Sequence, residues 1–307
     1  MRARAAALGL VALGLALALG LGASGCGGDD APPAPLGAKL LDAARASALT
    51  VTPSGELLVG ELETGVIVSS PPRATPLPRL KVATGGQRGL LGLAADRRGR
   101  VYAAYTRRGD RRIVVDRIAP GSSRRVWTGP PSADLANGGH LEVAPDGRLV
   151  IGIGDLQQPA RIGDPRAPNG KLLALRTDAP NRRPAILSTG WNNPFAFAFT
   201  PDGRLWVADN SPGRRPERLA RGDLGGPPGE VSELPRKIAP SAVAAISPTE
   251  LAICGFVSET LDRYRLRQGR WRSAGTIARG CRYGAVRLQD GRLAFSTGSA
   301  VRVVDAR

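Results

Sequence analysis

Histidine is almost absent from this chain, whose 307 residues include a single one, at position 140. Cysteine is also scarce, with three residues at positions 26, 254 and 281. A structural zinc site needs four Cys or His ligands at close, regular spacings. The two late cysteines and the lone histidine have no such spacing, so the sequence excludes a site of that kind.

Aromatic side chains make up only 4% of the residues and are scattered along the chain. Nucleic-acid sites concentrate basic residues and interleave them with aromatic ones. The net charge here is +17, but the arginines are spread over many expected loops. We therefore predict no nucleic-acid partner and interpret the arginines as solvated surface, with at most a weak attraction to anionic lipid or wall polymer.

Helical periodicity is missing after residue 25. Residues 152–154 read GIG, but they lack the third glycine and the following helix of a nucleotide-binding loop. These absences leave strands and turns as the material of the fold.

A short polar turn between two apolar stretches occurs six times. In it proline presets φ, aspartate bonds back to the backbone, and glycine takes the positive φ that closes a hairpin. The six copies centre on residues 52–56, 96–100, 144–148, 200–204, 247–250 and 288–292, the fifth being degenerate.

The turn glycines stand at 55, 99, 147, 203 and 291, which gives a repeat of roughly 45 to 55 residues with one double interval. One hairpin per repeat of this length indicates an all-β fold, a six-bladed β-propeller of four-stranded antiparallel blades. We expect one domain over residues 37–307. The expected units are 37–68, 89–115, 126–177 and 185–217, then two units within 238–307, with a long loop at 222–229.

The N-terminus has the layout of a secretory signal. Arg2 and Arg4 precede an apolar run over residues 5–25, and Cys26 follows a stretch of small residues. This resembles a bacterial lipoprotein box, so we expect residues 1–25 to be a signal peptide and Cys26 to be lipidated. Residues 26–36 then form a flexible tether, and the protein is extracytoplasmic and anchored to the cell membrane. A retained transmembrane helix is the alternative.

Cys254 and Cys281 remain after Cys26, both in the last two expected units. An even pair in an oxidising compartment is a plausible disulfide. Two buried free thiols remain the alternative.

Four segments together resemble the glucose/sorbosone dehydrogenase family, whose soluble members are six-bladed propellers that use pyrroloquinoline quinone (PQQ). They cover the second to fourth units. The segments are 86–93 (GQRGLLGL), 137–155 (with NGGHL, APDG and GD), 169–175 (NGKLLAL) and 190–206 (with GWNNPFA and PDGRLW).

The resemblance implies oxidation of an aldose at C1. A neutral histidine would take the hydroxyl proton while the hydride goes to the quinone. Basic side chains would bind the three carboxylates of PQQ, and calcium with oxygen ligands would polarise the quinone.

Several residues depart from the family pattern. The family's histidine base is replaced by Ala136, and its cofactor-binding arginine by Asn192. Trp191, Phe195 and Leu156 stand where the family has polar residues. We therefore expect PQQ-dependent oxidation to be weak or absent.

A few polar residues still match the pattern or stand near it, and each has an ordinary structural role as its alternative. His140 is a candidate base but follows Ala136 by four residues, roughly 13 Å of strand. The other candidates are Gln87, Asn193 and Arg282 for the cofactor, and Asp155 and Asp209 for the metal.

Three functions follow from these residues. The first is a divergent PQQ- and calcium-dependent sugar dehydrogenase. The second is a non-catalytic surface propeller that binds a saccharide or a protein at its central mouth. The third is a metal-dependent lactonase-like hydrolase with oxygen ligands from Glu61 or Glu63, Asn193 and Asp209.

Overall fold

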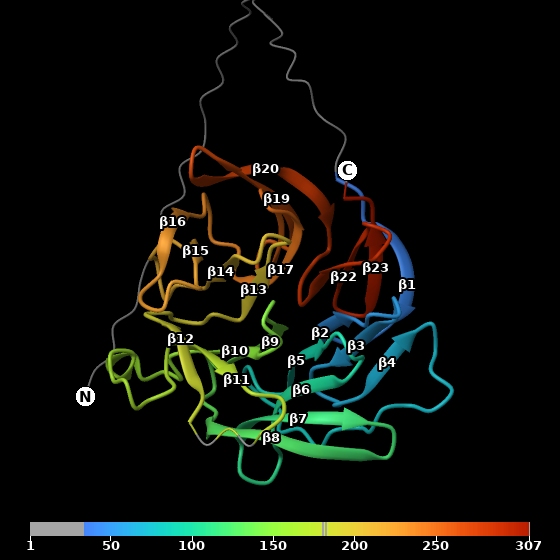
Figure 1. The fold of residues 1–307 in the computed structure, drawn as a ribbon. Helices are drawn as coiled ribbons and strands as arrows, with labels where there is room; N and C mark the ends of the chain where they lie inside the picture. The colour runs from blue at the N-terminus through green and yellow to red at the C-terminus, as the bar shows by residue number, and fades with distance from the viewer. Residues whose placement is uncertain (1–33, 180, 182, 307) are drawn as a thin grey trace, which may run out of the picture. The chain divides into compact units, whose positions relative to one another are not determined.

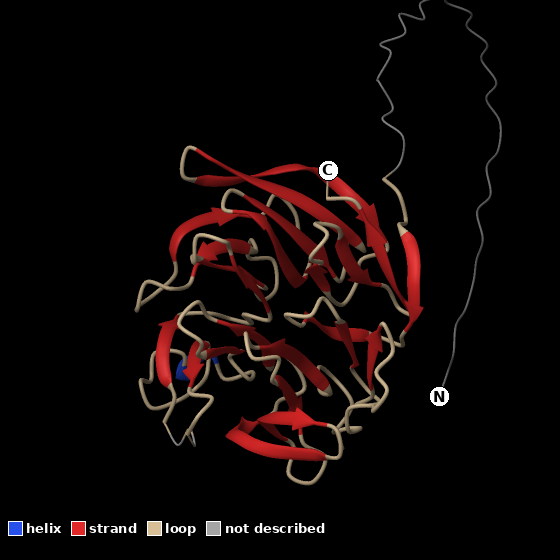
Figure 2. Ribbon diagram, turned by 45° about the vertical axis from the view of Figure 1, so that its right-hand side comes forward, coloured by secondary structure: helices blue, strands red, loops and turns tan. Residues whose placement is uncertain are grey.

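The computed structural model describes residues 34–179, 181 and 183–306. Over this part the chain forms 23 strands in six antiparallel sheets and one short 3-10 helix. The sheets stand around a common centre like the blades of a wheel (Figures 1 and 2). The expected all-β, six-bladed propeller is confirmed. The expected signal peptide and Cys26 lie outside the described residues. Within the described residues, no helix could span a membrane.

Four consecutive sheets, blades 2 to 5, have four strands each in chain order. Blade 2 holds β5 (Leu90–Ala95), β6 (Val101–Thr106), β7 (Arg112–Ala119) and β8 (Ser122–Pro131). Blade 3 holds β9 (Gly138–Val143), β10 (Leu149–Ile153), β11 (Lys171–Leu175) and β12 (Ala185–Thr189), with the 3-10 helix η1 (Pro159–Arg161) before β11. Blade 4 holds β13 (Ala196–Phe199), β14 (Leu205–Asp209), β15 (Arg218–Arg221) and β16 (Gly229–Glu233). Blade 5 holds β17 (Pro240–Ser247), β18 (Glu250–Gly255), β19 (Thr260–Arg267) and β20 (Arg270–Arg279).

The first and last blades differ from the expected plan. Blade 1 has three strands, β2 (Ala46–Val51), β3 (Leu57–Glu61) and β4 (Ile67–Ser70). Blade 6 takes β21 (Ala285–Arg287), β22 (Leu293–Ser296) and β23 (Ala300–Val304) from the end of the chain, and β1 (Ala38–Asp42) from its beginning. β1 pairs with β23 and so closes the ring, whereas the sequence had assigned it to the first unit.

The repeated turns join the first and second strands of their blades, as predicted. In five of them the glycine has φ between +74° and +86° and donates its amide to a carbonyl three residues earlier at 2.8–3.1 Å. The aspartates of these turns accept backbone amides, as Asp146 does from Arg148 at 3.0 Å. Because all these turns join first to second strands, they share one face of the wheel. The opposite face carries the entries into the first strands.

The apolar core lies between neighbouring blades. Six buried clusters occur in the described residues, and each combines side chains from two adjacent blades. Between blades 4 and 5, for example, the rings of Trp206 and Trp271 meet edge to face at 5.1 Å. Each blade therefore buries both faces only when the ring is complete.

A disulfide joins Cys254 on β18 to Cys281 just before β21, with their Cα atoms 5.5 Å apart. Both residues are fully buried in the cluster between blades 5 and 6. The bond therefore joins the last two blades covalently.

Candidate functional site

A cavity of about 360 Å³ opens at the centre of the face where the first strands begin. The six first strands contact one another around the ring, so their entries converge there. Every blade contributes to the lining, through these entries and through loops between second and third strands. Polar and aromatic lining residues include Arg45, Ser47, Glu63, Gln87, Asn193, Phe195, Asn210, Ser241, Phe256, Arg282 and Tyr283.

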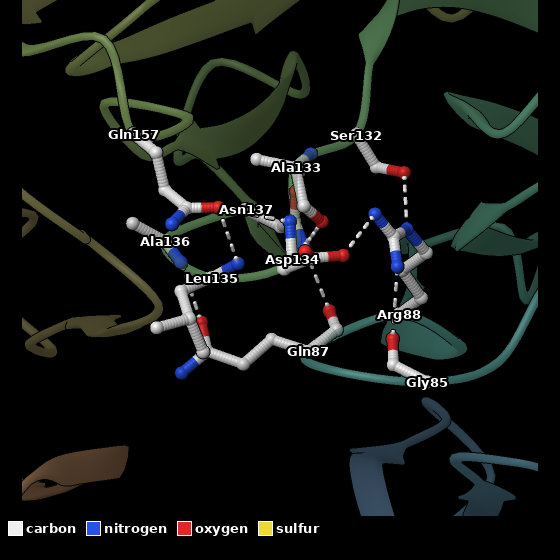
Figure 3. A network of polar contacts seen from close by, with 10 residues as sticks. All are labelled: Gly85, Gln87, Arg88, Ser132, Ala133, Asp134, Leu135, Ala136, Asn137 and Gln157. Atoms are coloured by element: carbon white, nitrogen blue, oxygen red, sulfur yellow. Dashed lines mark hydrogen bonds and ion pairs between the residues drawn. The ribbon is translucent and has the colours of Figure 1, made fainter.

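Gln87 lines this cavity but its groups are committed to the neighbouring loop (Figure 3). The side-chain Oε1 of Gln87 accepts the backbone amide of Ala136 at 2.7 Å. The backbone amide of Gln87 donates to the carbonyl of Asp134, also at 2.7 Å. Asn137 Nδ2 donates to the Gln87 carbonyl at 3.0 Å. Gln87 thus fixes the segment that carries Ala136, the position where the family has its base.

Asn193 also lines the cavity. Asp209 does not line it but holds the loop that carries Asn192 and Asn193. The Asp209 carboxylate is fully buried and accepts the amides of Asn192 and Asn193, the latter at 2.8 Å. It also receives two bonds from the Arg218 guanidinium. Burial raises the pKa of Asp209, against the opposing effect of Arg218 and the two amides.

Asp155 and Asn192 form a second support for the same loop. Asn192 Nδ2 donates to Asp155 Oδ2 at 2.8 Å, while Asp155 Oδ1 accepts the amide of Gln157 at 2.8 Å. Asp155 and Asp209 therefore hold the loops beside the cavity and do not line it. Both oxygens of each carboxylate already accept protein donors.

Two arginines reach the cavity, and each has an acidic partner. Arg45 pairs with Glu63 across the rim. Arg282 Nη1 lies 3.3 Å from Glu259 Oε1, and its guanidinium stands over the rings of Phe256 at 4.8 Å and Tyr283 at 5.9 Å. The positive charge of each arginine at the rim is therefore balanced by a glutamate. Phe256 and Tyr283 form an aromatic wall beside Arg282.

His140 does not line the cavity. It lies on β9 with 9% of its surface exposed, and its ring meets Phe197 edge to face at 4.7 Å, between blades 3 and 4. Its Nε2 is buried without a hydrogen-bond partner, 3.5 Å from Glu142 Oε1. The single imidazole of the chain therefore packs behind the lining, with its ring centroid 6.3 Å from that of Phe195, which does line the cavity.

The candidate metal ligands do not form one centre. Glu61 accepts the amide of Ala44 at 3.0 Å and the hydroxyl of Thr64 at 2.5 Å, while Glu63 is held by Arg45. Within the described residues, no group of three His, Cys, Asp or Glu side chains is placed to hold a metal ion.

Several lining residues had no signal in the sequence. Arg45, Asn210, Phe256 and Tyr283 come from loops or strand entries outside the recognised motifs. The regular spacing of the hairpins puts the loops between second and third strands on the same face as the entries into the first strands. This spacing is the only sequence feature that could have indicated the region in which these four residues lie.

These features define a six-bladed propeller with a small-molecule cavity at its mouth, the usual place for ligand sites in closed β folds. The family model for glucose/sorbosone dehydrogenase matches residues 44–217, more than half of the chain. The chain belongs to this family.

Solved structures agree on the fold. The PQQ-bound form of aldose sugar dehydrogenase from Streptomyces coelicolor is 19% identical, with 89% of this chain and 99% of that chain covered and a TM-score of 0.67. The apo-form of soluble aldose sugar dehydrogenase from Escherichia coli is 20% identical, with coverage of 86% and 98% and a TM-score of 0.71. A comparison with curated proteins finds no match.

The mouth residues do not fit the redox pair that the family implies. PQQ carries three carboxylates, but in the described part of the chain only two arginines line the cavity and both already pair with carboxylates, with Arg282 Nε left as a buried guanidinium nitrogen without a hydrogen-bond partner. Calcium takes six to eight oxygen ligands, and the expected carboxylates hold backbone amides instead. No catalytic step through PQQ or calcium follows from this arrangement.

Proposed function

We propose that this family member binds a saccharide at the mouth of the propeller and does not oxidise it. The observation that carries the proposal is the placement of His140, the only imidazole in the chain, in the packed interface between blades 3 and 4. The titratable side chains that line the cavity are Arg45, Glu63, Arg282 and Tyr283. None is an imidazole, and the one carboxylate is paired with Arg45, so no lining side chain stands free to take a proton from a sugar hydroxyl.

The lining suits a neutral, hydroxyl-rich ligand. Side-chain amides of Gln87, Asn193 and Asn210 and hydroxyls of Ser47 and Ser241 line one small volume. The amide oxygens of Gln87 and Asn193 accept backbone amides, and the two hydroxyls donate to backbone carbonyls. The amide nitrogens and the hydroxyl oxygens are therefore the groups left for a ligand. Amides and hydroxyls both donate and accept hydrogen bonds, as sugar hydroxyls do.

An aromatic wall completes the lining. The rings of Phe256 and Tyr283 meet edge to face at 5.5 Å and offer apolar surface beside the polar groups. Such a mixture of apolar walls and a few fixed polar groups is typical of small-molecule sites.

Calorimetric titration with a panel of aldoses tests the proposal. We expect one saccharide to bind, and Phe256→Ala to weaken it by roughly fivefold because an aromatic wall is lost. Val257→Ala is the matched control, since Val257 is 66% exposed and does not line the cavity. Absence of any saccharide binding, or an equal effect of both substitutions, contradicts the proposal.

We also propose that lipidated Cys26 anchors the propeller to the outer side of the cell membrane. The signal-like layout of residues 1–26 supports this. Membrane fractionation of Cys26→Ser tests it. The variant should appear in the soluble extracytoplasmic fraction, and retention in the membrane would contradict lipid anchoring.

The lactonase alternative remains a hypothesis without structural support. Glu61 and Glu63 are held by Thr64 and Arg45 on blade 1. Asp209 accepts the Asn193 amide, and Asn193 Oδ1 accepts the amide of Gly138, so these oxygens already have protein donors.

A further inference from the structure

A second and larger hollow lies on the side of the wheel, between the outer strands of blades 2 and 3. Its volume is about 830 Å³. One wall is the end of β8 with the start of β7, and the other is β12 with the residues before it, near the lower edge of the wheel in Figure 1. The loop between β10 and β11, which includes η1, closes one end. This hollow, the side groove, shares no lining residue with the mouth cavity.

Among the residues that the structure describes, four arginines and no acidic residue line the side groove. Arg112 comes from β7, Arg161 and Arg166 from the η1 loop, and Arg183 from the segment before β12. Some loop arginines elsewhere are paired with carboxylates, as Arg107 is with Asp110 and Arg176 with Asp178. What distinguishes the groove is that four arginines line one hollow. Among the described residues, no carboxylate forms an ion pair with the four groove arginines.

The loop that presents Arg161 and Arg166 is held firmly. Lys171 is buried, and its Nζ donates to the carbonyls of Ile162, Asp164 and Asn169 at 2.9, 3.0 and 3.1 Å. The Asp164 carboxylate accepts the amide of Arg166 at 2.8 Å. The arginines therefore stand on a fixed loop, which lowers the entropy cost of binding.

We propose that the side groove binds an extended oligomeric anion that carries carboxylate or phosphate groups at intervals along its length. Guanidinium groups bind both kinds of oxyanion in bidentate fashion. The groove is far larger than one phosphate or carboxylate and lies within the range of sites for whole organic ligands, so several charged units fit along it.

Other anionic partners fit less well. Pro130 and Pro131 at the end of β8 lack the amides that an acidic peptide needs to add as a strand. Trp127 is only 5% exposed and offers no platform on which a nucleic-acid base could stack. The arginines line a hollow, whereas a flat membrane surface is best met by a protruding face.

The test is a titration of the full chain with two fluorescently labelled probes, oligogalacturonate and inorganic polyphosphate, at physiological salt. We expect at least one probe to bind, and the tighter one identifies the carboxylate or phosphate source. Arg161→Gln with Arg166→Gln should weaken binding by about tenfold or more, because each removes charge-assisted hydrogen bonds. Arg183→Gln alone should weaken it by a smaller factor.

Arg214→Gln with Arg215→Gln is the charge-matched control, since both residues are exposed and lie outside the groove. We expect less than about a twofold effect, because distant charges are screened at this salt. Thermal melting shows that each variant is folded. Binding of neither probe, or equal weakening by the control substitutions, overturns the proposal.

Discussion

At the scale of single residues, Ala136 lacks the imidazole that the family has at this position and also adopts an unfavourable backbone conformation. Its φ is +54°, in the left-handed region that costs a non-glycine residue about 1–2 kcal/mol. Its amide is held by Gln87 Oε1 and its carbonyl accepts the amide of Leu156 at 3.0 Å. The conformation is therefore imposed by neighbours, and the alanine contributes neither proton transfer nor favourable geometry.

Replacement of Ala136 by glycine should stabilise the protein. Relief of the left-handed conformation outweighs the extra entropy of an unfolded glycine, for a net gain of about 0.5–1 kcal/mol. Chemical denaturation measures this gain. Ala274→Gly on the exposed part of β20 is the control and should lose about the same amount. A loss of stability in Ala136→Gly would contradict the strain argument.

Lys171 is a second residue with a defined structural role, since its Nζ donates to three backbone carbonyls. Burial lowers the pKa of Lys171, although the charge of Asp164 opposes this effect. We expect Lys171→Met to lose about 3 kcal/mol, because three carbonyls lose their common donor. Lys39→Met, which removes an exposed lysine whose Nζ pairs with the exposed Asp42, should change stability by less than about 1 kcal/mol. Equal effects in urea denaturation would mean that the Lys171 bonds contribute little.

At the scale of elements, the first-to-second strand turns determine the architecture. Their proline, aspartate and glycine give a local signal that is independent of distant contacts, so these hairpins could be predicted from the sequence. The last strands of the blades carry no comparable signal. The expected second unit therefore ended at residue 115, inside β7, and the expected third unit began at residue 126, inside β8, although both strands belong to blade 2.

The turn aspartates also predict a dependence of stability on pH. A hydrogen bond from Arg148 is the main cause of the lowered pKa of Asp146, and Arg292 lowers the pKa of Asp290 in the same way. Because these folded pKa values lie below the unfolded ones near 3.8, the carboxylates stabilise the native state above that pH. This contribution is lost as pH falls below about 4.

The measurement is the melting temperature between pH 2 and 7 for the protein and for Asp146→Asn with Asp290→Asn. Asparagine keeps the backbone hydrogen bond but not the charge. We expect the variant to melt lower at neutral pH and to match the parent near pH 2. A difference that persists at pH 2 would show that the charges are not its source.

At the scale of the whole molecule, stability depends on closing the ring. Each core cluster spans two blades, and β1 joins the start of the chain to its end through β23. The sequence predicted the ring from the repeat, but it misplaced β1 because a pairing across about 260 residues leaves no local trace. For the same reason the mouth residues Arg45, Asn210, Phe256 and Tyr283 were missed, since they meet only in the closed ring.

The disulfide between blades 5 and 6 should be a measurable part of that closure. It joins residues 27 positions apart, and a loop of this size contributes about 3 kcal/mol. Cys254→Ala with Cys281→Ala should therefore melt at a lower temperature. Reducing agent should lower the melting temperature of the parent and leave that of the variant unchanged. A variant as stable as the parent would contradict this role.

We propose that the mouth of this propeller binds its ligand without carrying out quinone chemistry. Calorimetric titration of the full chain with PQQ and calcium, followed by dye-reduction assays with aldoses, tests it most directly. We predict no tight stoichiometric PQQ binding and no aldose-dependent dye reduction. Tight PQQ binding together with turnover would contradict the account, because it would require a base and an anion site that the mouth residues do not provide.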